Sequence, residues 1–278
     1  MWIDAEGQST RWRMRMADGS YLGIQSLKGR VDEAEWQTRV DLAALYRLVA
    51  LFGWTDLIYT HISARVPGPE EHFLINPYGL YFDEITASSL VKVDLDGTIL
   101  QAPVWGDTEY GINPAGFTIH SAIHGARHDA KFVIHLHTAD GIAVSAHKEG
   151  LLPLNQHSLT VIPRLAYHDY EGIALHLDER ERLVADLGDK SLMLLRNHGT
   201  LALGPTAAHA FLGIHALERS ATLQVRTLSA GRDGILLAPE HAQAEVRQQV
   251  ANHRPDHAKL PWAGLLRRLA RESPGYDS

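Results

Sequence analysis

The sequence predicts a globular domain of the α/β class, in which helices and strands alternate. The chain has 278 residues, of which 45% are hydrophobic and 21% charged, a composition that supports a sizeable core. Segments in which apolar residues recur every three or four positions are interspersed with short β-type runs. We take the chain as one large domain with extensions rather than two small domains.

An amphipathic helix is predicted from Glu33 to Gly53. Its apolar residues recur at three- and four-residue spacings, which places them on one face: Trp36, Val40, Ala44, Leu48 and Leu51. Gly53 is expected to end this helix. Residues 1–34 show no sustained periodicity, so we expect an N-terminal extension with at most a short strand.

Short β-type runs follow the first helix and predict an antiparallel sheet with hairpins. The runs are Leu57–Arg65, His72–Ile75, Val91–Asp94 and Thr98–Leu100. The Asp96-Gly97 pair between the last two runs is a turn signal of the kind that joins antiparallel strands.

Helix and strand patterns alternate in the second half of the chain. The expected helices are Phe117–Arg127, Gly141–His147, 178–187 and Thr206–Leu228. The expected strands are Phe132–His137, Leu192–Arg196 and Gly199–Gly204. After Gly231 we expect two short helices, one of them the amphipathic segment Trp262–Ala270.

Composition and charge exclude several classes of protein. The sequence has no run of about 18 apolar residues and no signal-peptide pattern, so we expect a cytoplasmic protein without a membrane span. The net charge of -7 argues against general nucleic-acid binding, which needs a basic surface. The chain has no cysteine, so a strong metal site would have to use histidine, aspartate or glutamate.

Three histidines have positions that suit a metal site. His135 and His137 stand two residues apart in an expected strand, so both imidazoles project to the same side. His198 lies where another apolar strand enters a turn with glycine, so that its side chain can point into a cleft. Three such ligands would leave coordination positions open for a substrate. Two packed structural histidines remain an alternative interpretation of the His-x-His pair alone.

Several motifs in order resemble the class II aldolase/adducin family. They are NPAGFTIHSAIHGARHDAKFVIHLHT, AVSAHKEGLLP, AYHDYEG and LRNHGTLALG, and the likeness extends from about Val31 to Gly231. The resemblance implies a three-layer α/β/α domain with a mainly antiparallel central sheet, assembled as a homotetramer with sites near subunit interfaces. We divide the chain into an N-terminal extension (residues 1–34), the family domain (35–231) and a C-terminal helical tail (232–278).

The resemblance also implies a metal centre that departs from the sugar-phosphate aldolases. In the family, residues at the positions of His135, His137 and His198 bind the metal, so we expect one Zn, Mn or Fe(II) ion per subunit. Family members that act on sugar phosphates carry a glutamate four residues before a histidine, where this chain has Gly116 before His120. They bind phosphate at positions that here hold Thr60-His61 and Pro114-Ala115. A phosphorylated sugar is therefore not the expected substrate.

Further polar residues are candidates for the rest of the site. His120 is a candidate catalytic residue, as a fourth ligand or proton donor, although a buried structural histidine is an equal alternative. The other catalytic candidates are Glu109, in a glycine-flanked segment, and Tyr167. His61 is a candidate for substrate binding and is expected to face the cleft, as are His157 and Arg164 in the stretch that lines family sites.

Three functions are compatible with this pattern. The first is a metal-dependent lyase that cleaves a carbon-carbon bond of a small non-phosphorylated oxo or hydroxy acid, as a decarboxylase or an aldolase. The second is a non-haem Fe(II) oxygenase that shortens an aryl 2-oxo acid, as in the aminocoumarin antibiotic pathways. The third is a non-catalytic module similar to the head domain of adducin. Retention of all three candidate ligands favours a catalytic function over the non-catalytic module.

Overall fold

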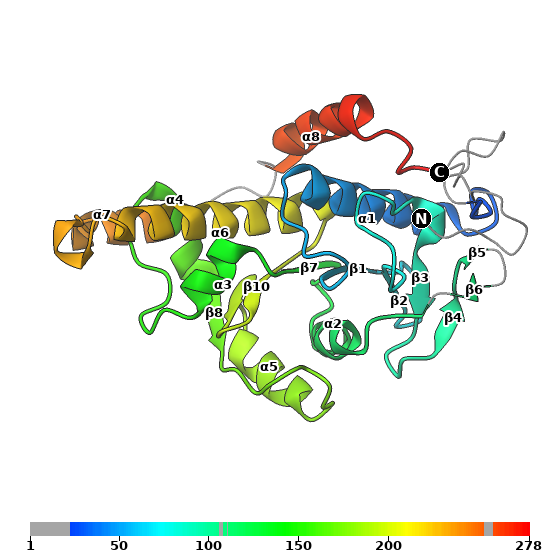
Figure 1. Cartoon of the computed structure of the whole chain (residues 1–278), viewed down its shortest axis with the longest axis horizontal. Coiled ribbons are helices and arrows are strands. Elements are labelled where there is room, and N and C mark those ends of the chain that lie inside the picture. The colour runs from blue at the N-terminus through cyan, green and yellow to red at the C-terminus, as the bar shows by residue number, and fades with distance from the viewer. Residues whose placement is uncertain (1–22, 106–107, 110, 253–257) are drawn as a thin grey trace, which may run out of the picture.

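The computed structural model describes residues 23–105, 108–109, 111–252 and 258–278 (Figure 1). Its centre is an eight-stranded sheet with the order β4-β3-β2-β1-β7-β10-β9-β8. The strands in this order are Ile99–Gln101, Val91–Val93, Phe73–Ile75, His61–Arg65, Phe132–Leu136, Gly199–Gly204, Leu192–Leu195 and Leu165–His168. A separate two-stranded sheet pairs β5 (Val104–Trp105) with β6 (Thr108–Glu109).

Helices cover both faces of the sheet (Figure 1). On one side lie α1 (Glu33–Leu51), α6 (Ala207–Leu228) and α8 (Lys259–Glu272), and on the other lie α2 (Pro114–Ala126) and α5 (Glu179–Leu187). The remaining helices are α3 (Ala139–Ser145), α4 (Gln156–Val161) and α7 (Glu240–Ala251). The expected three-layer α/β/α domain is confirmed. No helix in these described segments has the length and apolar character needed to span a bilayer.

Strand alternation divides the core between the two helical layers. Ile62 and Ile134 pack with side chains of α1 and α6 on one face. Val133 and Leu201 face the other way and pack with side chains of α2 and α5. His135 is two residues from Val133 and therefore lies on the α2 face.

Most of the expected elements are confirmed, with three differences. The predicted strand Leu57–Arg65 begins only at His61, because Leu57 adopts a left-handed turn conformation with φ 47°. The sequence analysis missed four short elements, namely α4, β8 and the paired strands β5 and β6. All strand pairs of the sheet are antiparallel except β8 and β9, which run parallel because α5 crosses between them.

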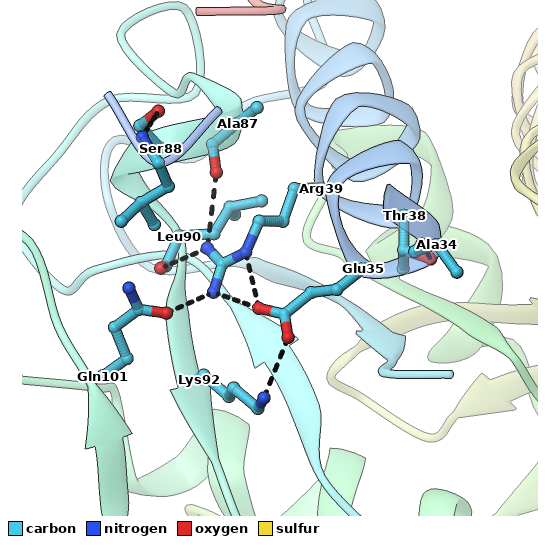
Figure 2. A network of polar contacts seen from close by, with 10 residues as sticks. Ala34, Glu35, Thr38, Arg39, Ala87, Ser88, Leu90, Lys92 and Gln101 are labelled. Atoms are coloured by element: carbon cyan, nitrogen blue, oxygen red, sulfur yellow. Dashed lines mark hydrogen bonds and ion pairs between the residues drawn. The ribbon is translucent and has the colours of Figure 1, made fainter. Parts of the chain in front are cut away.

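A buried ion-pair network attaches α1 to the far edge of the sheet (Figure 2). The Arg39 side chain is fully buried, and its Nε donates to Glu35 Oε1 over 2.9 Å. Its guanidinium also donates to the carbonyl of Leu90 at 3.0 Å and to Gln101 Oε1 at 2.8 Å. Lys92 contacts the second oxygen of Glu35 at 2.9 Å. Burial alone would raise the pKa of Glu35, but Lys92 and Arg39 hold it below its ordinary value.

We expect Arg39→Ala to lower the free energy of unfolding by about 3–5 kcal/mol, since it leaves Glu35 buried with one cation fewer. Urea denaturation measures the change. Gln37→Ala, at an exposed position of the same helix, is the control and should change the stability by less than about 0.5 kcal/mol. Equal losses in the two variants would contradict a stabilising role for the network.

Candidate metal centre

Three imidazoles converge at one end of β7 and β10. His135 lies in β7, and His137 follows its last residue. Their Nε2 atoms are 3.0 Å apart. The ring of His198 lies 4.7 Å from that of His135 and 4.9 Å from that of His137, between ring centroids. One nitrogen from each of the three lies within 4.8 Å of the others.

The turn between β9 and β10 brings His198 to this point. Asn197 has φ 56°, a left-handed conformation that asparagine tolerates better than most residues. Gly199 follows, and a Cβ atom there would collide with the carbonyl oxygen of Leu136 and lie 3.2 Å from the His137 ring. Only glycine lets β10 approach β7 this closely, so Gly199 is needed to bring the turn against the two strand histidines.

Hydrogen bonds orient two of the three rings. His135 Nδ1 donates to the carbonyl of Thr200 over 3.0 Å, and His137 Nδ1 lies 3.1 Å from Asp56 Oδ2. Each ring is thereby held with Nε2 toward the shared point, the arrangement that metal-binding histidines usually have. The sequence analysis missed Asp56, and nothing in its surroundings along the chain indicated a partner for His137.

The electrostatics of His135 and His198 suit a cation. Burial, followed by the charges of His198 and His61, lowers the pKa of His135 well below its ordinary value. Burial lowers the pKa of His198 to about 4. Neutral imidazoles offer lone pairs at neutral pH, and three of them fit Zn, Mn or Fe(II) with positions left open.

A buried carboxylate supports the centre from the opposite face of the sheet. Glu218, on α6, accepts hydrogen bonds from the hydroxyls of Thr138 and Thr200, the latter over 2.5 Å. Thr200 also supplies the carbonyl that holds His135. Burial raises the pKa of Glu218 to about 7. Its sequence signal was a charged residue within the apolar stripe of a long helix.

An open pocket lies beside His198. Its volume is about 570 Å³, and it is lined by Ser145, Ala146, His147, Lys148, Asp169, Tyr170, Arg196 and Asn197. The Tyr170 ring lies 6.5 Å from the His198 ring, between centroids. Arg196 is held over the ring of Tyr167 at 4.4 Å and donates to the carbonyl of His147 at 2.7 Å. The pocket therefore presents two cationic side chains, Lys148 and Arg196, and one acidic side chain, Asp169, next to the histidines.

A second histidine cluster lies under α2 and contains two of the predicted site residues. Nδ1 of His61 is 2.8 Å from Nε2 of His120. Nδ1 of His120 contacts the Ser63 hydroxyl, which lies 2.7 Å from Nε2 of His124. Nδ1 of His124 is 3.1 Å from the carbonyl oxygen of Ala130. We call His61, His120, Ser63 and His124 the buried histidine chain.

The buried histidine chain is enclosed by protein, and burial favours the neutral form of its imidazoles. Burial lowers the pKa of His61 and of His120 well below the ordinary value, and that of His124 to about 3. His61 was expected to face a cleft, but only 2% of it is exposed, because α2 covers it. Ser63 and His124 were not singled out, although they lie two and four residues from His61 and His120, the spacings that share a strand face and a helix face.

The other predicted site residues lie away from the three converging histidines. The Tyr167 hydroxyl accepts from the Leu151 amide at 3.1 Å, and Arg164 donates to the carbonyl of Thr160 at 3.3 Å. His157 is exposed on α4. Among the described residues, no hydrogen bond or ring contact joins them to His135, His137 or His198. Glu109 belongs to β6, but its side chain lies outside the described part of the structure.

The raised pKa of Glu218 predicts a pH dependence. The folded chain holds this proton up to about pH 7, whereas an ordinary glutamate loses it near 4.5. Its contribution to stability is therefore complete below pH 4.5 and is lost as the pH rises through 7. Relative to Glu218→Gln, the wild type should lose about 3 kcal/mol of unfolding free energy over this window. Denaturation curves at several pH values measure it.

Glu245→Gln, an exposed change on α7, is the matched control and should follow the wild-type curve. If Glu218→Gln also follows that curve, the raised pKa is contradicted.

Comparisons with known proteins agree with this architecture. Residues 40–225 match the family model for the Class II Aldolase and Adducin N-terminal domain. A Caulobacter vibrioides protein named after the class 2 aldolases is 67% identical over 261 residues, which cover 94% of this chain and 99% of that protein. Alpha-adducin of Rattus norvegicus is 46% identical over 242 residues, 84% of this chain but only 32% of adducin.

Solved structures give the same result. An aldolase II superfamily protein from Pseudomonas syringae superimposes with a TM-score of 0.86 at 56% identity, covering 91% of this chain and 100% of its own. The L-fuculose 1-phosphate aldolase of Glaciozyma antarctica gives a TM-score of 0.74 at 26% identity, covering 86% and 90%. The chain therefore belongs to the class II aldolase/adducin family.

Proposed function

We propose that this protein is a metal-dependent lyase that cleaves a carbon-carbon bond beside the carbonyl or carboxylate of a small non-phosphorylated oxo or hydroxy acid. The observation that carries the proposal is the convergence of three imidazoles beside a pocket with two cationic side chains. His135, His137 and His198 would hold one divalent ion per subunit. Bound there, the ion would withdraw electrons from the carbonyl next to the bond that breaks.

The chain's own residues would orient the substrate. Arg196 is fixed by its contacts with Tyr167 and His147, so its guanidinium is already placed before an anion arrives. Together with Lys148 it would attract a carboxylate to the pocket. Three neutral ligands leave the full charge of the ion to the substrate, which favours an anionic acid over a neutral sugar.

The remaining predicted residues keep their proposed roles. His120 would act through His61, because both of its ring nitrogens are engaged inside the protein. Tyr167 and Glu109 are proposed for proton transfer, and His157 and Arg164 for substrate binding. Any contact of His157 or Arg164 with the substrate would involve a neighbouring subunit or a change in the loops.

A sugar phosphate is not the proposed substrate, although one similar protein is an L-fuculose 1-phosphate aldolase. An added Cβ at Gly116 would lie 2.5 Å from Cδ2 of His61. A glutamate therefore has no room at position 116 while the His61 ring occupies that space.

We propose that the subunits form a homotetramer, in line with the family. Tyr170, which lines the pocket, and three apolar residues that follow it along the chain are more than half exposed: Tyr170 (54%), Ile173 (71%), Leu175 (56%) and Leu177 (55%). Apolar side chains gathered in this way are typical of a subunit interface. Light scattering coupled to gel filtration measures the mass. A cytoplasmic location also stays a prediction.

A non-catalytic, adducin-like role is the second candidate, because alpha-adducin shares 46% identity with this chain. The Fe(II) oxygenase remains a third hypothesis, which rests on the ligand set alone. Both candidates differ from the lyase in whether they consume an acid and whether that reaction needs oxygen.

We expect His135→Ala and His198→Ala to lower metal affinity by more than about 100-fold, since the hydrogen-bond partners of ligands alone account for about 10- to 100-fold. Asp56→Ala removes such a hydrogen-bond partner from His137 and should lower metal affinity by about 10- to 100-fold. Elemental analysis and chelator competition measure the change. The control is His128→Ala, whose side chain is 78% exposed. Full metal occupancy in both ligand variants would refute the metal centre.

We expect a panel of 2-oxo and 2-hydroxy acids to contain a substrate for protein loaded with Zn, Mn or Fe(II). A lyase consumes it under argon as well as in air, whereas an oxygenase needs air. L-fuculose 1-phosphate should not be cleaved, because Gly116 and His61 replace the groups that such a substrate requires. Efficient cleavage of that compound would contradict the proposal, and no consumption under any condition would favour the adducin-like role.

A further inference from the structure

The hydrogen bonds of the buried histidine chain all run in one direction, because the chain ends on a carbonyl oxygen, which can only accept a hydrogen bond. The carbonyl oxygen of Ala130 cannot donate a hydrogen bond, so Nδ1 of His124 must carry the proton that bridges them. A neutral His124 then has a bare Nε2 nitrogen, which accepts from the Ser63 hydroxyl. That hydroxyl has only one proton, so it must accept from Nδ1 of His120.

The same logic continues to His61. Because His120 carries its proton on Nδ1, its Nε2 is bare and accepts from His61 Nδ1. A neutral His61 therefore has its lone pair on Nε2. No hydrogen bond joins that nitrogen to any residue that the structure describes. One backbone carbonyl thus determines, through three imidazoles and a serine, that His61 presents an acceptor.

His61 lies beside the candidate metal centre without being part of it. It is opposite His135 in the pairing of β1 with β7, and their ring centroids are 5.0 Å apart. The nitrogens within 4.8 Å of one another belong to His135, His137 and His198 only, among the residues described. The ring of His61 is thus outside the group of three ligands but adjacent to His135, one of its members.

We infer that His61 Nε2 accepts a hydrogen bond from a hydroxyl of the molecule held at the metal centre, so that the site selects hydroxy acids over the matching oxo acids. This rests on the proposed function and narrows its substrate class. A 2-hydroxy acid offers an O–H donor, whereas a 2-oxo acid presents only acceptors and would leave two lone pairs facing each other.

Packing keeps His61 in this orientation. Its ring fills the space beside Gly116, where an added Cβ would lie 2.5 Å from Cδ2 and 2.9 Å from Nε2. Gly125 lies on the same helix, and a Cβ there would meet nothing closer than 3.8 Å. The two glycines form a matched pair, since alanine at either one changes the helix backbone alike but only one displaces His61.

The tautomer is tested directly by long-range ¹H–¹⁵N NMR on the Zn-loaded protein labelled with ¹⁵N-histidine. We expect His61 with a proton on Nδ1 and a bare Nε2. In Ser63→Ala the proton of His61 should no longer be confined to Nδ1, because the variant removes the hydroxyl that links His120 to His124. A proton on Nε2 of His61 in the wild type would overturn the inference.

Selectivity is tested by calorimetry with L-lactate and pyruvate as probes of the Zn-loaded protein. We expect lactate to bind about tenfold more tightly than pyruvate, the effect of one hydrogen bond. The preference should disappear in His61→Phe and Gly116→Ala and persist in Gly125→Ala. If zinc binds but the ratio of lactate affinity to pyruvate affinity is the same in the wild type and all three variants, the inference fails while the metal centre stands. If zinc does not bind the wild type, the proposed function itself fails.

Discussion

Strand β7 is the constraint on which the site depends. It lies inside the eight-stranded sheet and is hydrogen-bonded on both edges, to β1 and to β10. A shift of one residue in either register would turn His135 toward the opposite helical layer. The pairing also sets His61 opposite His135, so the metal centre and the buried histidine chain share one rigid support. The close contact at Gly199 then determines where His198 meets them.

The site is polar and largely buried, and most of its buried polar groups are hydrogen-bonded within the protein. A buried polar group without a partner destabilises a fold by about 1–3 kcal/mol. Glu218 is matched by two threonine hydroxyls, and the nitrogens of His120 and His124 each have a partner. These contacts also fix orientation, because a ring held by one nitrogen directs the other. Stability and site geometry therefore depend on the same hydrogen bonds.

Position 116 links the packing of the helix α2 to the candidate site. The His61 ring occupies the space in which a side chain at position 116 would lie. Glycine at position 116 and the histidine at position 61 therefore depend on each other. A single substitution at either position would leave a cavity or a collision, so the two residues are expected to change together. Membership of the family therefore establishes the architecture, while the substrate depends on such local exchanges.

The sequence by itself determined most of the helices and strands and, with the family resemblance, the three histidines that converge. Helical periodicity identified α1 and α6, and the two-residue spacing of a strand put His135 and His137 on one side, because these are local properties of the backbone. Only the tertiary structure decided which residues form hydrogen bonds with the side chains of the site. Asp56 reaches His137 across 81 positions and Glu218 reaches Thr138 across 80, and no local pattern encodes such contacts. The burial of His61 under α2 was likewise decided by packing, since the pairing of β1 with β7 and the missing side chain at Gly116 together create the space that its ring fills.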